Sequence, residues 1–278
     1  MSNHEVIFRG GLGNQLFCLL YAYKLSLKYN IKVSINLINY NISRRNDRKF
    51  VLQNLFPQIF NEFKINKSSF SYFLFIYAGL YEKYLLNDKL NRLPGDKSFS
   101  LKYWPQKYIH SGYFQKISNS KINKKSLDLL KKSFNTFSSK NKLNYLAIHI
   151  RRGDYLMRQH KMHGIIPEKY LYYESLKQIK RNNYDGITIF SDSPELIDLD
   201  FFNPLHKNIT FDIGGNAIEV FKRMANHNGL IASNSSFSLW AGILGDIQNF
   251  SIPSYWIKNV KSSVLGLEEI SRYDCELV

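Results

Sequence analysis

The sequence predicts an α/β protein with two Rossmann-like halves, and three observations predict this class. The chain opens with a short strand, a glycine-rich turn, an apolar helix and a second strand, which is the order of a βαβ unit. The second half repeats the alternation of apolar strands and amphipathic helices. The 278 residues, 44% of them hydrophobic, are enough for roughly two domains, each with a core of its own.

The first βαβ unit occupies residues 5–35, with strands expected at residues 5–9 and 31–35. The helix between them starts at Leu16 and keeps apolar residues at helical spacing through Leu27. The preceding turn, residues 10–15, lacks the third glycine of a dinucleotide fingerprint and the Gly-Lys-Ser/Thr of a phosphate loop.

We expect this turn to face a binding cleft with the backbone amides of its glycines and with two polar side chains. The residues concerned are Gly11, Gly13, Asn14 and Gln15. The alternative is a turn that only permits close packing of the helix.

Residues 40–140 show no clean periodicity. The aromatic-rich segment Phe70–Leu86 carries Glu82 and Lys83, which leaves too short an apolar stretch to span a bilayer. It is expected to be a core helix, with an interfacial membrane patch as the alternative. A basic amphipathic helix at residues 121–137 leads into a polar stretch, where we place the boundary between domains 1–140 and 141–278.

The second half predicts strands at residues 146–150, 186–190, 209–211 and 229–233. Helices are expected at residues 167–180, 217–226 and 237–244. The apolar positions of the first of these helices are Leu171, Tyr172, Leu176 and Ile179.

The most informative stretch is His149-Ile150-Arg151-Arg152-Gly153-Asp154-Tyr155, which follows the apolar strand at 146–150. A buried parallel strand delivers its next residues to the carboxyl edge of the sheet, where open α/β folds bind ligands. Arginine suits phosphate because its planar fork binds two oxygens and stays charged. The stretch therefore indicates a phosphorylated ligand, and the alternative is a solvated turn with a local ion pair.

A second anion site is indicated where Asn234-Ser235-Ser236 caps the helix at 237–244. Hydroxyls and free amides at a helix N-terminus attract anions. These residues could equally be ordinary caps. If they share the sheet edge with the two arginines, they contact the same phosphates.

Charge and cysteine content restrict the class of partner. The net charge of +16, from 38 basic and 22 acidic side chains, favours a polyanion, an anionic membrane surface or a phosphorylated substrate. No RNA-recognition signature, zinc-finger spacing or heptad-linked basic helix is present, so we expect no nucleic-acid partner. The two distant cysteines and the absence of a signal-peptide pattern favour the cytoplasm.

Three blocks together resemble the inverting α-1,2-fucosyltransferases, glycosyltransferase family 11. They are residues 10–17 (Gly-Gly-Leu-Gly-Asn-Gln-Leu-Phe), residues 149–155, and residues 233–240 with Phe190-Ser191-Asp192 before them. The resemblance spans most of the chain. It implies a GT-B architecture, two Rossmann-like domains facing across a cleft, with GDP-fucose held mainly by the C-terminal domain and the acceptor by the N-terminal one.

The resemblance also implies roles for single residues. Arg151 and Arg152 look like the pair that binds and neutralises the donor diphosphate, Asp192 like a contact to the nucleoside, and Ser235 and Ser236 like phosphate contacts. The predicted substrate-binding set is completed by His149, Asn234 and the turn residues Gly11, Gly13, Asn14 and Gln15.

Displacing a diphosphate requires a metal ion or fixed cations to stabilise the leaving group. Asp198-Leu199-Asp200 matches a DxD metal pattern but no apolar strand precedes it, so we expect no metal and no cofactor, with the arginines in place of a metal. The catalytic candidates are Arg152 and two possible bases, Asp154 first and His163 second. An ion pair of Asp154 with an arginine is the structural alternative.

The expected function is transfer of L-fucose from GDP-fucose to the 2-hydroxyl of a terminal β-galactoside during assembly of a bacterial surface polysaccharide such as O-antigen. The acceptor is expected to be a galactose-terminated oligosaccharide or a lipid-linked glycan, with peripheral contact to the anionic inner face of the cytoplasmic membrane. Two alternatives stay open, the same fold with another nucleotide-sugar donor and a non-catalytic protein that binds polyanions or nucleic acid.

Overall fold

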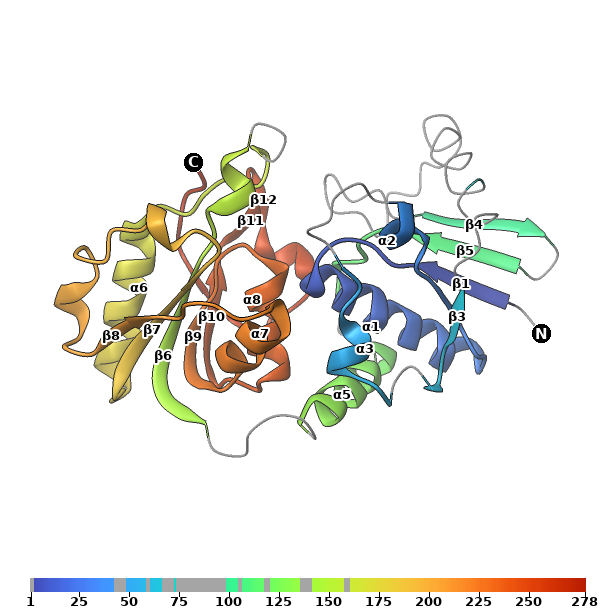
Figure 1. The fold of residues 1–278 in the computed structure, drawn as a ribbon, viewed down its shortest axis with the longest axis horizontal. Helices are drawn as coiled ribbons and strands as arrows, with labels where there is room; N and C mark the ends of the chain where they lie inside the picture. The colour runs from blue at the N-terminus through green and yellow to red at the C-terminus, as the bar shows by residue number, and fades with distance from the viewer. Residues whose placement is uncertain are drawn as a thin grey trace. The chain divides into compact units, whose positions relative to one another are not determined.

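The structure of the chain is a computed structural model in which two compact units, Met1–Ser133 and Phe134–Val278, each hold a largely parallel sheet (Figure 1). It describes residues 3–42, 49–58, 61–66, 73, 99–104, 107–117, 121–135, 142–157 and 161–278. The predicted α/β class, with one Rossmann-like sheet in each half, is confirmed. The predicted boundary at 140/141 lies outside the described residues, as does the segment Phe70–Leu86 apart from Phe73.

The N-terminal unit begins with the predicted βαβ unit. Its elements are β1 (Asn3–Ile7), α1 (Leu12–Tyr29) and β2 (Ser34–Asn36), followed by α2 (Ile38–Ile42), α3 (Leu52–Leu55), β3 (Lys64–Asn66), β4 (Phe99–Trp104), β5 (Lys107–Ser111) and α5 (Lys121–Asn135). The sheet order is β3-β2-β1-β5-β4, and only the pairing of β4 with β5 is antiparallel.

The turn into α1 depends on glycine. Gly10 has a φ of 76°, and a Cβ there would lie 2.7 Å from Nδ2 of Asn14. Gly11 is the extended N-cap residue and provides no side-chain cap. The helix therefore starts at Leu12, earlier than predicted, and ends at Tyr29, followed by the C-cap residue Asn30, whose φ of 51° is left-handed.

The C-terminal unit contains a fully parallel six-stranded sheet of order β13-β10-β9-β6-β7-β8. Its strands are β6 (Leu143–Ile150), β7 (Gly186–Ser191), β8 (Ile209–Phe211), β9 (His227–Ile231), β10 (Asn249–Pro253) and β13 (Ser271–Tyr273). Its helices are α6 (Glu168–Arg181), α7 (Ala217–Ala225) and α8 (Ser236–Leu244), and β11 (Tyr255–Ile257) pairs with β12 (Val260–Lys261).

The order of the strands creates a switch point at β6. From β6 the chain crosses to β7 and then β8, and it returns to β9 on the other side of β6. Right-handed crossovers in opposite directions place α6 on one face of the sheet and α7 and α8 on the other. Such a sheet binds ligands where neighbouring strands lead away in opposite directions, which here is the carboxyl edge of β6 and β9.

The predicted strands and helices of this half are confirmed, and so is the apolar face of α6. Leu171 is fully buried, and Tyr172, Leu176 and Ile179 are partly buried against the same core. The helix also buries three polar residues that the sequence did not predict, Glu174, Ser175 and Gln178. Gln178 is satisfied inside the protein, because its amide donates to Oγ of Ser251 and accepts from the Tyr184 hydroxyl. Within the described ranges, no helix is both long and apolar enough to cross a bilayer.

A buried pair of histidines joins β1 and β5. Nδ1 of His4 lies 2.9 Å from Nε2 of His110, and the Tyr21 hydroxyl lies 3.1 Å from Nδ1 of His110. The rings of Tyr29 and Tyr108 each stack on His4 with centroids 4.6 Å apart. Burial, with the neighbouring His4 as the second cause, lowers the pKa of His110 to about 3. His110 is therefore neutral in the folded protein at physiological pH.

This burial predicts acid sensitivity. An unfolded histidine titrates near pH 6.5, so the unfolded chain binds more protons than the folded chain as the pH falls below that value. Lowering the pH from 7.5 to 5.5 should therefore remove about 1.4 kcal/mol of unfolding free energy through His110 alone. Urea unfolding at both pH values measures it. Between the two pH values, the His110→Gln variant should lose about 1.4 kcal/mol less unfolding free energy than the wild-type protein. An identical loss in both proteins would contradict the prediction.

Candidate functional site

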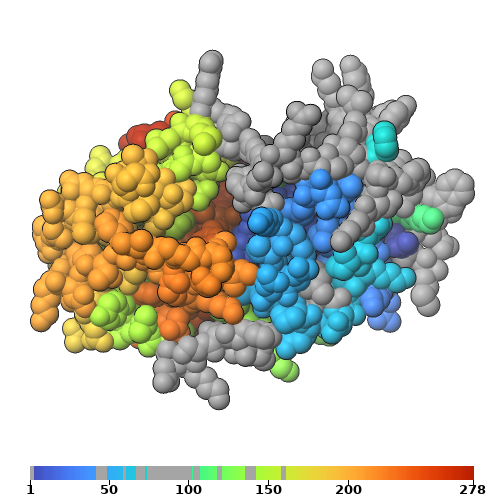
Figure 2. Space-filling view, viewed as in Figure 1, coloured from blue at the N-terminus to red at the C-terminus, as the bar shows by residue number. Residues whose placement is uncertain are grey.

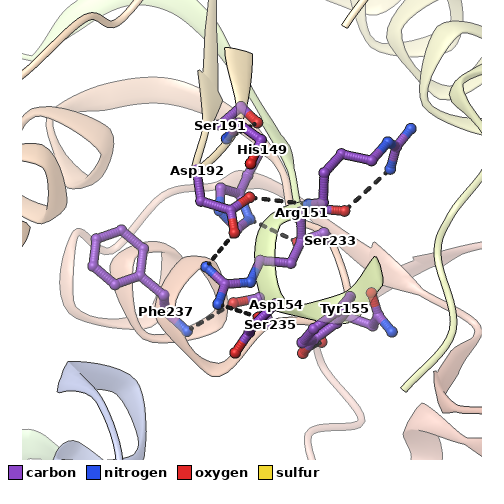
Figure 3. Close-up of polar contacts among 12 residues, drawn as sticks. His149, Arg151, Asp154, Tyr155, Ser191, Asp192, Ser233, Ser235 and Phe237 are labelled. Atoms are coloured by element: carbon purple, nitrogen blue, oxygen red, sulfur yellow. Dashed lines mark hydrogen bonds and ion pairs between the residues drawn. The ribbon is translucent and has the colours of Figure 1, made fainter. Parts of the chain in front are cut away.

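Three polar stretches meet at the carboxyl edge of the C-terminal sheet. They are residues 151–155 after β6, Asp192 after β7 and residues 233–236 after β9 (Figure 3). They converge because β6 pairs in parallel with both β7 and β9. The prediction that the two arginines and the capping serines share one sheet edge is confirmed.

Arg151 is held between two carboxylates. Its Nη2 lies 2.6 Å from Oδ1 of Asp154 and its Nη1 lies 3.0 Å from Oδ2 of Asp192. Its guanidinium carbon lies 5.4 Å from the centre of the Tyr155 ring, within cation–π range. Burial alone would lower the pKa of Arg151, but Asp192 and Asp154 outweigh it and raise the pKa above its usual value. The side chain is fixed and charged, and 27% of it is still exposed.

Arg152 points into the protein, and its predicted contact with the donor diphosphate stays a prediction. Its Nη1 donates to the backbone carbonyls of Arg151 and Ile166 at 3.1 and 3.2 Å, and its Nη2 donates to Oε1 of Glu168 at 3.1 Å. Only 10% of its side chain is exposed. The described site therefore combines two cations with three carboxylates, and it contains the ion pair of Asp154 with an arginine that the sequence left open.

Asp192 braces the loop after β6. Besides its contact with Arg151, it accepts a hydrogen bond from the backbone N–H of Arg152 at 2.9 Å. A Cβ on Gly153 would overlap the Asp192 carboxylate, so this position requires glycine. The predicted contact of Asp192 with the nucleoside stays a prediction, and the structure adds a positioning role for it.

His149 joins the ends of β6 and β9. Its Nδ1 shares a hydrogen bond of 2.7 Å with Oγ of Ser233, and its ring lies 6.2 Å from that of Phe237. Burial, with the charge of Arg151 as the second cause, lowers the pKa of His149 to about 3. The imidazole is therefore neutral at physiological pH and fixes the distance between the two strand ends.

The residues after β9 have two kinds of contact. Oγ of Ser235 caps α8 by accepting from the Phe237 N–H at 3.3 Å. The side-chain amide of Asn234 donates to the carbonyls of His163 and Gly164 at 2.8 and 3.2 Å. Ser236 is the half-buried first residue of α8. The described contacts thus show a helix cap and a brace for the loop 161–165, and the predicted phosphate contacts stay predictions.

Both candidate bases lie beside Tyr155. Asp154 is paired with Arg151, as the structural alternative for this residue required. The His163 ring stacks on the Tyr155 ring with centroids 4.8 Å apart and an interplanar angle of 14°, and the Tyr155 hydroxyl donates to the Asn234 carbonyl. The sequence spacing of 163 and 155 carries no signal for this stack.

The predicted residues of the N-terminal unit lie at the turn after β1, and each is described within that unit. Gln15 does not face a cleft, which corrects its prediction: it is fully buried, donates to the carbonyls of Gly10 and Lys49, and accepts from the Val51 N–H. Asn14 accepts a hydrogen bond from Gln115 at 3.1 Å. Gly13 is buried in the first turn of α1, and Gly11 is half-buried with open space where a Cβ would stand.

The aspartates of the DxD match form a local turn. Asp198 accepts from the Asp200 N–H at 3.0 Å, and Asp200 accepts from the Asn203 side chain at 2.9 Å. Across the part of the chain that the structure describes, no three His, Cys, Asp or Glu residues are grouped so that they could hold a metal ion.

Two contributors to the site were missed from the sequence, Glu168 and Ser233. Glu168 is in the first turn of α6, where an acidic residue is expected for the helix dipole alone, so nothing marked it as the partner of Arg152. Ser233 could have been noticed as a hydroxyl directly after a buried strand, but its histidine partner is 84 residues away.

Comparison with known proteins gives one family and distant relatives. A model of the family described as "Glycosyl transferase family 11" matches residues 4–259. An "Alpha-1,2-colitosyltransferase" from Escherichia coli is 26% identical, over 95% of this chain and 93% of that protein. The "O-antigen biosynthesis glycosyltransferase WbnK" of Escherichia coli is 28% identical, over 45% of this chain and 43% of that protein.

Solved structures resemble the chain more weakly. A structure of Arabidopsis thaliana FUT1 in complex with GDP covers 93% of this chain and 71% of its own, with 10% identity and a TM-score of 0.49. E. coli heptosyltransferase WaaC with ADP covers 99% and 93%, with 10% identity and a TM-score of 0.45. Both TM-scores are below 0.5, so we draw no functional conclusion from them.

Because Arg152 is buried and Arg151 is partly exposed, replacing each of them should lower the free energy of unfolding by a different amount. Arg152→Leu leaves Glu168 and two carbonyls without their buried partner and should lower the free energy of unfolding by about 3 kcal/mol. Arg151→Leu removes two partly exposed ion pairs and should lower the free energy of unfolding by only about 1 kcal/mol. Urea unfolding of both variants measures the difference, and equal costs would refute the internal role of Arg152.

Proposed function

Because the chain belongs to glycosyltransferase family 11, we propose that it transfers L-fucose from GDP-fucose to the 2-hydroxyl of a terminal β-galactoside. In this reaction a base takes the proton of the acceptor hydroxyl while its oxygen bonds to the anomeric carbon. The bond from that carbon to the diphosphate breaks, and its electron pair leaves with GDP. Attack from the face opposite the diphosphate inverts the anomeric centre.

The relatives support parts of this proposal. The protein is a glycosyltransferase by family, and the relative that covers most of the chain is named for an α-1,2 linkage. The second relative is named for O-antigen biosynthesis, which supports a role in assembling a surface polysaccharide. The first relative is also named for colitose, so a donor carrying a sugar other than fucose is the second candidate.

The observation that carries the proposal is the position of Arg151. It stands at the switch point of a parallel sheet, partly exposed and held by two carboxylates in one orientation. A fixed guanidinium costs no reorganisation when negative charge develops on the leaving diphosphate. The N-terminus of the nine-residue helix α8 adds its dipole and free amides at the same edge, with Ser235 and Ser236 as further donors.

We assign three other residues of the site to positioning. Arg152 holds the loop to Ile166 and Glu168, Asp192 orients Arg151, and His149 fixes the β6 and β9 ends. None of these roles needs a metal ion, and we propose that Arg151 and the α8 N-terminus supply the charge that a metal supplies elsewhere.

Asp154 is our first candidate for the base. In the described structure its carboxylate is engaged by Arg151 at 2.6 Å. A diphosphate that binds the Arg151 guanidinium competes for the same N–H donors, so its arrival would release Asp154 next to the reacting carbon. His163, stacked on Tyr155 beside it, is the second candidate.

We propose that the N-terminal unit binds the acceptor, a galactose-terminated or lipid-linked glycan, with Gly11, Gly13 and Asn14 at the turn after β1. The net charge of +16 suits a peripheral contact with the anionic inner face of the cytoplasmic membrane, where lipid-linked glycans are assembled.

A release assay tests the proposal. The protein, GDP-fucose and a panel of β-galactosides are incubated with excess EDTA, and free GDP is measured. We expect release that requires an acceptor and falls at least about 100-fold in Arg151→Ala, because one fixed charge on a leaving group contributes on this scale. Arg181→Ala serves as the control, since this exposed arginine ends α6 at the opposite edge of the sheet.

Three results would contradict the proposal. Turnover that stops with EDTA and returns with a divalent ion would refute the metal-independent mechanism. Full activity of Arg151→Ala would refute the role of that residue. If the protein turned over another nucleotide sugar and not GDP-fucose, the donor would be the second candidate, a nucleotide carrying a sugar other than fucose.

A further inference from the structure

We propose that Ile213, in the loop between β8 and α7, forms an apolar contact for the base of the donor nucleotide. This inference rests on the proposed function, because it takes the diphosphate to lie at Arg151. It adds a subsite for the nucleoside end of the donor.

The protein limits the direction in which the nucleoside can extend from the diphosphate. On the β10 and β13 side of the switch point, the protein covers its own sheet edge. The Ser254 N–H donates to the Tyr273 carbonyl, the Ser262 N–H donates to the Ser254 carbonyl, and the buried Tyr273 hydroxyl donates to the carbonyl of Ala232 just after β9. The polypeptide that follows β10 and β13 therefore occupies this side of the sheet edge.

The opposite side of the same edge carries the ends of β7 and β8. The two strands pair in parallel, and the Asp212 N–H donates to the Ile189 carbonyl at 2.9 Å, so the residue after β8 stands beside the end of β7. Neighbouring strands lie about 4.8 Å apart, which places the end of β8 roughly 10 Å from the end of β6. This is the scale of an extended nucleoside diphosphate whose phosphates contact the loop after β6.

The loop that begins at the end of β8 is held rigidly. Arg223 of α7 donates to both carboxylate oxygens of Asp212, at 2.5 and 2.7 Å, and to the Gly214 carbonyl at 2.6 Å. Gly214 and Gly215 have φ angles of 86° and 98°, and Asn216 forms a capping box with Glu219 at the start of α7. The loop therefore has a defined shape without a ligand.

This fixed loop presents its only large apolar side chain to solvent. Ile213 is 83% exposed, more than any other large hydrophobic residue in the described part of the chain. Figure 2 shows the orange segment that contains the loop at the surface of the C-terminal unit. Single exposed apolar residues are common on protein surfaces, so exposure alone means little. Ile213 lies on a loop held by Arg223, at the β8 end of the sheet edge that carries Arg151, and this position indicates a preorganised contact for a flat apolar group such as a base.

The test compares two probes, GDP and inorganic pyrophosphate, by calorimetric titration. Ile213→Ser should weaken GDP binding about five-fold, the expected loss for a small apolar contact, and leave pyrophosphate binding unchanged. Ile213→Tyr should tighten GDP binding several-fold, because an aromatic ring stacks on a base and not on a ribose. Leu143→Ser is the matched control, since this exposed residue begins β6 at the amino edge of the same sheet.

The outcomes separate this proposal from the proposed function. If the wild-type protein binds GDP and neither Ile213 variant changes the affinity, the base subsite is refuted while the donor assignment stands. A parallel loss of GDP and pyrophosphate binding in Ile213→Ser would also refute it, since the effect would then lie at the phosphates. If the wild-type protein binds neither probe, both proposals fail.

Discussion

The site depends on the contact between the Asp192 carboxylate and the loop after β6. One oxygen accepts the Arg152 N–H, the other pairs with the Arg151 guanidinium, and the absence of a side chain on Gly153 leaves room for the carboxylate. This contact turns the end of a buried strand into a loop of fixed shape. It also ties the end of β7 to the end of β6, so the sheet itself sets the position of Arg151.

Two adjacent arginines therefore have separate tasks. Arg152 points inward, and its contacts to Ile166 and Glu168 attach the loop to the start of α6. Arg151 lies at the carboxyl edge of the sheet, where two carboxylates, Asp154 and Asp192, pair with it. A diphosphate carries more charge than one carboxylate and can bind the guanidinium fork with two oxygens, so it can displace Asp154. Binding of the donor would then also release the candidate base, Asp154, from its ion pair with Arg151.

The sequence predicted the βαβ start, the strand β6, the polar run after it and the cap of α8, because each of these is encoded by local periodicity and residue type. It could not predict the direction of Arg152, which depends on Ile166 and Glu168 and hence on the path of a loop without periodicity. The apolar face of α6 was predicted, but the burial of Gln178 was not, because its partners Tyr184 and Ser251 come from other elements. The turn residue Gln15 was misread for the same reason, since Lys49 and Val51 bind it from a distant segment.

The central claim is that Arg151, at the β6 switch point, binds the donor diphosphate. A crystal structure of the protein with GDP tests it most directly. We expect a diphosphate oxygen within hydrogen-bonding distance of the Arg151 guanidinium and near the first turn of α8, with Asp154 no longer paired to that arginine and Arg152 still bound to Glu168. A diphosphate bound by Arg152, or bound away from this edge while Arg151 keeps both carboxylates, would contradict it.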